Sequence, residues 1–191
     1  MSAPEERPRL PTPAWAHTGS FIELGRGPNA GDPAARLAIL ERIHRYCWGY
    51  DERRLDELMD CFTENAVWEG NVMGETRVGP IEGRAAIGEW LSGFWPVQRD
   101  QRRHMILNAI VEAQTEETAT VMTYLLLLGA RHAEVSLETM GFYRYTVERD
   151  GGAWRISHLF AGFDAPFWPG QLKDLSEKGR KRHGVFEEVQ S

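Results

Sequence analysis

His104 and Asp51 are the residue types that removal of a proton from carbon at neutral pH would require. Histidine is the side chain whose unperturbed pKa lies near neutrality, so it can act as a general base. A carboxylate on its other ring nitrogen would fix the tautomer and stabilise the imidazolium that forms. Each residue also has a simpler interpretation, because Asp51 can cap a following helix and His104 can be an ordinary residue at the end of a strand. Taken singly, the two residues favour the simpler interpretations.

Two tyrosines precede Asp51 and extend this chemistry. Tyr46 and Tyr50 are four residues apart, so on a helix they share one face. A phenol can donate a hydrogen bond to an oxygen that becomes more negative during an elimination. The alternative is that one of the two tyrosines packs in the core.

Aromatic residues are numerous, with seven Trp, eight Phe and five Tyr. Such residues can line a cavity for a flat apolar or aromatic molecule, although most aromatic side chains in a domain belong to its core. The group that assists a leaving group is open, with His132, Tyr143, Tyr124 and His158 as candidates. His158 shares its predicted strand parity with Trp154 and Ile156, which favours a structural histidine. The predicted substrate-binding residues are Trp48, Trp68, Trp90, Phe94, Tyr124, Phe142 and His158.

Several other chemistries lack the motifs they need. The six histidines form no HxH or HExxH pattern, so we predict no metal site. No glycine-rich phosphate loop is present, so we predict no nucleotide cofactor, and no cofactor of any kind. Cys47 and Cys61 form no CxxC pair, and Cys47 lies on an apolar helix stripe, which favours a core position over a nucleophile.

Length and charge limit the class of protein. The chain has 191 residues, about one domain's worth, and a formal charge of -6, which disfavours nucleic acid as a partner. No apolar run approaches the ~18 residues of a membrane span. The first residues lack the layout of a signal peptide, so we expect a cytoplasmic protein with no membrane partner.

The elements that must position these residues follow from periodicity. Residues 1–31 are rich in Pro and Gly and form an arm, residues 32–165 form the domain, and residues 166–191 form a charged tail. Asp32 and Pro33 begin a helix that runs to Tyr50. Its predicted buried stripe consists of Leu37, Leu40, Ile43, Cys47 and Trp48. The other predicted helices are 53–62, 83–94 and 172–182; the strands are 65–70, a short one within 72–81, 102–114, 118–128, 134–147 and 153–161.

The order of these elements, with helices first and long strands afterwards, is typical of an α+β domain. We therefore predict a strongly curved mixed or antiparallel sheet wrapped by the N-terminal helices. Between the two layers such a cone leaves an internal pocket lined by alternate strand residues.

Short motifs in this order resemble those of a known superfamily. They are the run from Arg45 to Asp51, Leu55-Asp56-Glu57-Leu58, the run from Phe62 to Trp68, Ile81-Glu82-Gly83, and the final hairpin from Gly151 to Ile156. Together they resemble the SnoaL-like branch of the nuclear-transport-factor-2-like superfamily over roughly residues 34–165. The nearest-looking members are scytalone dehydratase, bile-acid 7α-dehydratase and hexachlorocyclohexane dehydrochlorinase.

The resemblance implies a cofactor-independent lyase that acts on a small cyclic or aromatic molecule. It places Asp51 and His104 at the positions of the family's catalytic pair, and Tyr46 and Tyr50 beside them, in a homotrimer. The chain departs from these relatives at Leu127, Gly129 and Leu159, where they carry further catalytic groups. Two alternatives stay open: an isomerase or polyketide cyclase that uses the same pocket, and a non-catalytic ligand-binding or assembly subunit such as the β subunit of ring-hydroxylating dioxygenases.

Overall fold

The fold contains three helices and six strands in the residues that the computed structural model describes, 31–72 and 76–165. Most of the predicted arm and all of the predicted tail, including the helix expected at 172–182, lie outside these residues. No helix in the described ranges is long and apolar enough to cross a membrane. The elements are α1 (Pro33–Asp51), α2 (Leu55–Asp60), β1 (Phe62–Val72), β2 (Thr76–Glu82), α3 (Arg84–Ser92), β3 (Gln101–Gln114), β4 (Thr118–Arg131), β5 (Glu134–Asp150) and β6 (Ala153–Phe163).

Helix α1 begins as predicted. The Asp32 carboxylate accepts hydrogen bonds from the backbone N–H groups of Ala34 and Ala35, and Pro33 takes the first helical position, where its missing N–H costs nothing. The buried stripe differs from the predicted one. It follows Ile39, Ile43, Tyr46, Cys47 and Tyr50, whereas Leu37, predicted inside, is 71% exposed.

Gly49 lets the first two helices pack closely. A Cβ atom on this glycine would lie only 2.9 Å from the Cα atom of Leu58 in α2, well inside normal contact. Leu58 is fully buried against α1 as a result. The glycine therefore fixes the corner at which α1 ends, and Asp51 lies at that corner.

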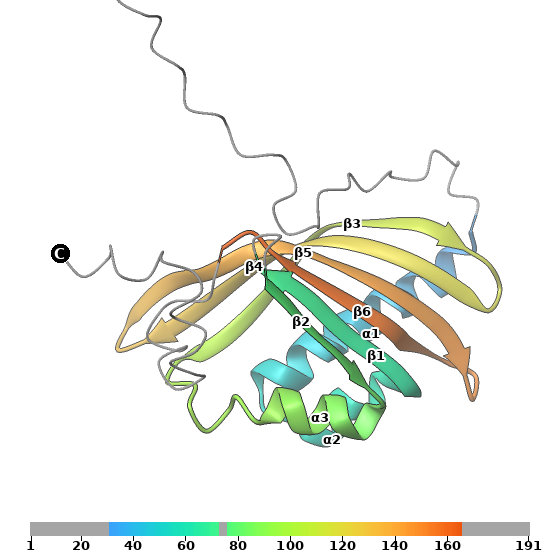
Figure 1. Cartoon of the computed structure of the whole chain (residues 1–191). Coiled ribbons are helices and arrows are strands. Elements are labelled where there is room, and N and C mark those ends of the chain that lie inside the picture. Colours follow the sequence, from blue (N-terminus) through green and yellow to red (C-terminus); the bar gives the residue numbers. More distant parts are fainter. Residues whose placement is uncertain (1–30, 73–75, 166–191) are drawn as a thin grey trace, which may run out of the picture.

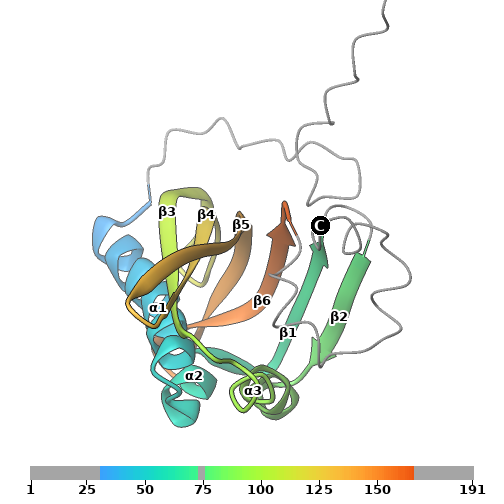
Figure 2. The ribbon, with the colours of Figure 1, turned by 90° about the vertical axis from the view of Figure 1, so that its left-hand side faces the viewer.

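The six strands form one open, mixed sheet in the order β2-β1-β6-β5-β4-β3. Strands β1 and β6 are parallel, and every other neighbouring pair is antiparallel. The sheet bends strongly, and the three helices gather on one side of it (Figures 1 and 2). We call the side that the helices cover the inner face and the opposite side the outer face. The predicted α+β class is confirmed.

The predicted final hairpin is also confirmed. Asp150 pairs with Ala153 across the turn, and Gly151 and Gly152 have φ angles of 60° and 84°. Glycine adopts such positive φ angles without the steric cost that a Cβ atom would add.

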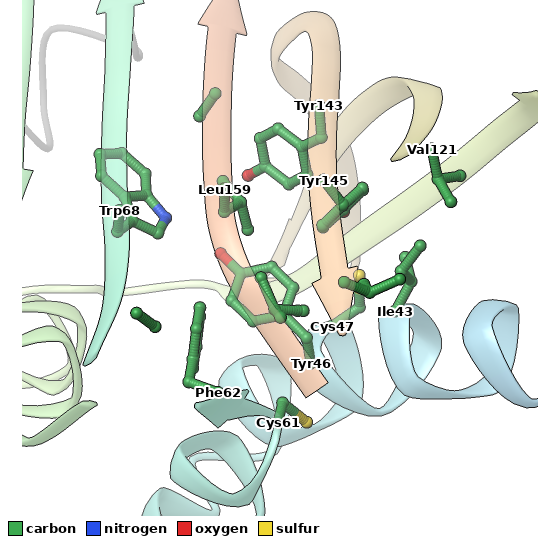
Figure 3. Packing of buried hydrophobic residues seen from close by; sticks show 14 of the residues in the cluster. Ile43, Tyr46, Cys47, Cys61, Phe62, Trp68, Val121, Tyr143, Tyr145 and Leu159 are labelled. Carbon is green, nitrogen blue, oxygen red and sulfur yellow. The ribbon is translucent and has the colours of Figure 1, made fainter. Parts of the chain in front are cut away.

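The core lies between the inner face and the helices (Figure 3). Both free cysteines belong to it, in agreement with the structural interpretation of Cys47. Burial raises the pKa of the Cys61 thiol to about 11, so it stays protonated at neutral pH. The fully buried members include Ile39, Ile43, Leu58, Phe62, Ile87, Val121, Leu125, Tyr145, Ile156 and Leu159.

Candidate active site

Asp51 and His104 meet although they lie far apart in the sequence. Nδ1 of His104 lies 2.6 Å from Oδ1 of Asp51, and the backbone N–H of His104 donates to Oδ2 of Asp51 over 2.8 Å. Both carboxylate oxygens of Asp51 are therefore hydrogen-bonded to the same residue, His104. The side chains are only 6% and 7% exposed, so solvent screens the pair little.

The local chain directions explain this contact. Asp51 is the last residue of α1, and its backbone carbonyl accepts a hydrogen bond from the Gln101 side chain at the start of β3. An ion pair between Arg103 and Glu52 joins the same two segments with a distance of 2.7 Å. The helix-cap interpretation of Asp51 is wrong, because the cap residue of α2 is Arg54 and no side chain caps that helix.

The hydrogen bond assigns the tautomer of His104. A carboxylate only accepts hydrogen bonds, so Nδ1 carries the hydrogen and donates it to Asp51. In the neutral ring, Nε2 then holds the lone pair. This is the arrangement in which Nε2 takes up a proton and the carboxylate stabilises the resulting positive charge.

Tyr50 packs edge-on against the imidazole. The centroids of the Tyr50 and His104 rings are 5.2 Å apart at an interplanar angle of 77°. The Tyr50 hydroxyl donates to Oε1 of Gln98 over 3.3 Å. Burial raises the pKa of Tyr50 to about 12, while the Arg102 charge acts in the opposite direction. Tyr50 is therefore a hydrogen-bond donor throughout the neutral range.

Tyr46 and Tyr143 also lie close to the imidazole ring. The ring centroid of His104 is 6.4 Å from that of Tyr46 and 6.3 Å from that of Tyr143. Tyr46 is 1% exposed, and burial raises its pKa far above the usual range of a phenol. Burial raises the pKa of Tyr143 in the same way. Both hydroxyls stay protonated, so both can donate hydrogen bonds.

Three of the predicted substrate-binding residues form an aromatic wall. Trp68 lies against Trp90 with ring centroids 4.4 Å apart, and Trp90 meets Phe94 edge-on at 5.0 Å. Trp68 comes from β1, Trp90 from α3, and Phe94 from the turn after α3. The wall is thus built where the third helix covers the inner face of the sheet.

A hollow of about 330 Å³ has Asp51 among its lining residues. It is formed by the end of α1 and by the loop that leads into β3. The lining residues are Asp51, Glu52, Arg53, Gln98, Arg99, Asp100 and Gln101.

Trp48 is not brought to this site. It was expected to line the pocket, but it is 63% exposed, whereas its neighbour Cys47 is 5% exposed. Successive helix residues differ by about 100° around the axis, so Trp48, two residues from both Tyr46 and Tyr50, lies on the opposite side of the helix from that buried pair. The prediction for Trp48 is corrected accordingly.

Tyr124 and Phe142 lie on the outer face, opposite the dyad. They pair across β4 and β5, and Tyr124 is 59% exposed while Phe142 stacks on Phe160 at 5.9 Å. Their sequence neighbours Leu125 and Tyr143 are buried on the inner face. Adjacent strand residues point to opposite faces, so these two do not share a pocket with His104.

His158 also lies on the outer face, where it contacts Glu69 over 3.1 Å. The predicted parity with Ile156 fails because the register shifts: Ile156 pairs with Val147 and His158 with the preceding Thr146. One extra residue in β6 therefore turns the following side chains over. His132, another candidate, is an exposed residue of the turn after β4, with a φ angle of 52°.

The sequence analysis did not single out Arg102. Its guanidinium donates to Asp100 through Nε over 2.7 Å and through Nη2 over 3.2 Å, and the two side chains are 4% and 7% exposed. Arg102 precedes His104 by two residues on β3, so both belong to the same face of the strand. This shared parity is the sequence signal by which Arg102 could have been found.

The described residues contain no group of three or more His, Cys, Asp or Glu side chains able to hold a metal ion.

The chain belongs to the SnoaL-like family, since the model of the SnoaL-like domain matches residues 33–159. The expected superfamily is thereby confirmed. No curated protein matches the chain.

Solved structures share the fold at low sequence identity. A Mycobacterium tuberculosis protein of unknown function is 24% identical, with a TM-score of 0.61 over 72% of this chain and 76% of that one. An NTF2-like protein with a cystatin-like fold from Novosphingobium aromaticivorans is 22% identical, with a TM-score of 0.54 over 80% and 97%. A candidate β subunit of an aromatic-ring-hydroxylating dioxygenase from the same species is 15% identical, with a TM-score of 0.58 over 69% and 90%.

Proposed function

We propose that the protein is a cofactor-independent lyase that removes water or another small fragment from a cyclic or aromatic molecule. The observation that carries the proposal is the buried contact between Nδ1 of His104 and the Asp51 carboxylate. A structural histidine does not need a partner that accepts from both its ring and its backbone. A general base does need a fixed ring with one free nitrogen.

The residues of the site divide the work of an elimination. His104 takes a proton from carbon through Nε2, the electrons of that C–H bond form a C=C bond to the neighbouring carbon, and the leaving group departs from that carbon with its bonding electrons. The imidazolium then gives its proton to the departed group, which restores the neutral base. Asp51 stabilises the imidazolium as it forms. Tyr46 donates a hydrogen bond to the substrate oxygen whose negative charge grows, or Tyr50 does so in exchange for its hydrogen bond to Gln98.

The polarity of the substrate is inferred from the aromatic wall. Trp68 and Trp90 belong to the same hydrophobic core as Tyr46 and Tyr143, and Phe94 contacts Trp90 edge-on. Flat apolar molecules bury much of their surface against such rings, at about 25 cal/mol per Å² of apolar area. This supports a small cyclic or aromatic substrate over an extended polar one.

An isomerase or polyketide cyclase would use the same base, and only the fate of the substrate separates these reactions from a lyase. A lyase releases a fragment, whereas an isomerase or cyclase keeps every atom. An assembly subunit is less well supported, because assembly does not require a buried and fully hydrogen-bonded histidine–carboxylate pair. The likeness to a dioxygenase β subunit is one of fold.

The test is a substrate screen with matched variants. Cyclic and aromatic diols and hydroxy-ketones are incubated with the protein, new double bonds are followed by ultraviolet absorbance, and products are identified by mass. The proposal expects a product lighter than its substrate, formed by wild type and by His158→Ala but not by His104→Ala. Equal turnover by a folded His104→Ala variant would refute it.

We also propose that the protein assembles into a homotrimer through the outer face of the sheet. Tyr124 on β4 faces Leu107 on β3 and Phe142 on β5, so one apolar surface runs across three strands. Monomeric proteins rarely expose a continuous apolar patch of this kind. Its exposed members include Met105, Leu107, Ile110, Tyr124, Val135, Leu137 and Met140.

A further inference from the structure

A buried ion pair between Arg102 and Asp100 lies at the start of β3, close in sequence to His104. The guanidinium donates through Nε to one carboxylate oxygen over 2.7 Å and through Nη2 to the other over 3.2 Å. Arg102 is 3% exposed and Asp100 is 9% exposed. A guanidinium that binds both oxygens fixes the direction of the carboxylate as well as its position, and separating the two charges in the interior would be costly. The pair therefore anchors residue 100 to the strand that carries His104.

Gly129 on β4 leaves room for this ion pair. It lies opposite Arg102 in the antiparallel pairing of β3 with β4. A Cβ atom at this position would lie 2.6 Å from Oδ2 of Asp100 and 2.7 Å from Oε1 of Glu138. Packed atoms do not approach each other that closely, so a larger residue at 129 would displace the Asp100 carboxylate. The ion pair thus depends on a residue without a side chain in the neighbouring strand.

The backbone of Asp100 connects the ion pair to Tyr50. Nε2 of Gln98 donates to the carbonyl of Asp100 over 3.1 Å, which fixes the orientation of the amide. Oε1 of Gln98 therefore faces Tyr50 and accepts from its hydroxyl over 3.3 Å. The Tyr50 ring in turn packs edge-on against the imidazole of His104. A continuous series of contacts runs from the guanidinium of Arg102 to the ring of the dyad.

The same short segment also holds the end of α1. Nε2 of Gln101 donates to the backbone carbonyl of Asp51 over 2.9 Å. Nη2 of Arg53 donates to the backbone carbonyl of Gln98 over 3.3 Å. These bonds and the Tyr50 hydroxyl attach the helix end to residues 98–101, which the ion pair anchors. We call residues 98–102 the brace.

The charge of Arg102 reaches Tyr50 as well. Burial raises the pKa of the Tyr50 phenol, and among the neighbouring charges that of Arg102 acts most strongly against this rise, ahead of Arg53. Arg102 therefore influences Tyr50 in two ways, through the hydrogen bonds of the brace and through its charge. An experiment on the brace has to keep the charge constant.

We propose that Arg102 is a positioning residue, which acts through the brace to hold the Tyr50 hydroxyl beside the imidazole. This inference rests on the proposed function, in which Tyr50 is one of two candidate donors to the substrate oxygen. A donor that is held in one place before the reaction needs no reorganisation when charge develops on the substrate. Arg102 supplies this order without touching the reacting atoms. The alternative is that the ion pair only stabilises the fold.

The experiment observes the Tyr50 hydroxyl by nuclear magnetic resonance and needs no substrate. Tyrosine labelled with carbon-13 at the ring carbon that bears the oxygen gives one signal for each of the five tyrosines. Tyr50→Phe identifies the signal of Tyr50. The chemical shift of this carbon depends on whether the hydroxyl donates a hydrogen bond. Gln98→Leu removes the acceptor and gives the position of the signal without this bond.

Two variants loosen the ion pair in different ways. Arg102→Lys keeps the positive charge but replaces the planar fork of N–H groups with a single ammonium group. Gly129→Ala leaves both charges in place and pushes the Asp100 carboxylate aside. The control is Arg155→Lys, which makes the same replacement outside the brace, at an arginine whose Nη2 donates to the Asp60 carboxylate over 2.8 Å.

The expected result is that both variants move the Tyr50 signal at least halfway from its wild-type position to its position in Gln98→Leu. Arg155→Lys should leave the signal in place, and the signal of the exposed Tyr124 should stay constant throughout. Circular dichroism confirms that each variant folds. A wild-type Tyr50 signal in folded Arg102→Lys and Gly129→Ala would overturn the inference, because the ion pair would then only stabilise the fold. Equal signals in wild type and Gln98→Leu would also overturn it.

Turnover of a substrate found by the screen gives a second readout. Arg102→Lys should lower kcat about tenfold, the loss expected for one hydrogen bond, and leave KM within about twofold. In a Tyr50→Phe background the same replacement should have no further effect, whereas losses that add would contradict an action through Tyr50. The two proposals fail separately. Full turnover by His104→Ala refutes the lyase and leaves the Tyr50 signal to decide on the brace, and an unmoved Tyr50 signal leaves the lyase standing.

Discussion

The sheet carries a histidine–carboxylate pair on each face, and the two pairs differ in nearly every physical respect. On the inner face, His104 occupies both oxygens of Asp51, and the side chains are 6% and 7% exposed. On the outer face, His158 shares Glu69 with Arg77, and the His158 side chain is 37% exposed. The residue types are the same, so the surroundings decide what each pair can do.

The comparison shows which features make such a pair chemically competent. Burial keeps water from screening the Asp51 charge, and the backbone hydrogen bond fixes the carboxylate as well as the ring. In the outer pair, the Arg77 guanidinium already balances the carboxylate, and solvent reaches the imidazole. We therefore assign the inner pair to chemistry and the outer pair to surface electrostatics.

The largest expected effect separates the two histidines. Replacing His104 with Ala should lower kcat/KM by about 10³-fold, because a positioned general base contributes about 10²- to 10⁴-fold. Replacing His158 with Ala should change it less than about twofold. Circular dichroism confirms that both variants fold. Similar losses in the two variants would remove the distinction between the faces.

Replacing the two carboxylates, Asp51 and Glu69, should separate the two pairs in the same way as replacing the histidines. Asp51→Asn keeps the size of the side chain but removes the charge and lets the ring adopt the wrong tautomer, so kcat should fall about a hundredfold or more. Glu69→Gln is the matched control and should leave kcat unchanged. Steady-state kinetics at one pH, the same for wild type and both variants, measures both. A fully active Asp51→Asn variant would contradict the assigned role.

The outer face should respond in its assembly state. Tyr124→Arg places a charge in the middle of the exposed apolar surface, and burying that charge in an interface costs more than the interface gains. Light scattering after size exclusion should show a trimer for wild type and a monomer for the variant. Thr120→Arg, farther along β4, serves as the comparison and should stay trimeric. A wild-type monomer would disprove the assembly.

The smallest effect concerns the stability contributed by the outer pair. Burial alone would raise the pKa of Glu69, but hydrogen bonds from Arg77 and His158 lower it below its usual value. A lowered folded-state pKa stabilises the protein above the unfolded pKa of about 4.3 and loses this effect as pH falls through the folded value. Glu69→Gln should therefore reduce the free energy of unfolding by about 0.5 kcal/mol at pH 7.

Denaturant titrations at several pH values check the sign. The difference between wild type and Glu69→Gln should shrink toward zero below about pH 4, where the carboxylate becomes protonated in both states. A difference that grows on acidification would show that the ion pair does not lower the Glu69 pKa.

The sequence predicted the elements of this fold better than the faces of its strands. Helix starts and hairpins have local signals, such as Asp32 before Pro33 and the glycines at 151 and 152. The run from Tyr124 to Leu128 is apolar at every position, so its alternation does not reveal the inner face. The extra residue in β6 then reverses the predicted parity of His158, and no local signal marks it.

The contact between Asp51 and His104 could not be derived from periodicity at all. Its two residues belong to a helix end and a distant strand, and only a resemblance to a family with known geometry suggested the pairing. The packing of Tyr143 against His104 likewise joins two separate strands, β5 and β3, and no local signal marks it. Arg102, in contrast, was accessible, because it shares strand parity with His104.

The most direct test of the dyad is the nitrogen-15 spectrum of the His104 imidazole, which needs no substrate. With labelled protein and His104→Gln to assign the signals, the chemical shifts report which ring nitrogen holds the hydrogen in the neutral ring. We expect a protonated Nδ1 and a Nε2 with a free lone pair, and loss of this preference in Asp51→Asn. A neutral ring that carries its hydrogen on Nε2 could not accept a proton there, and that result would contradict the central claim.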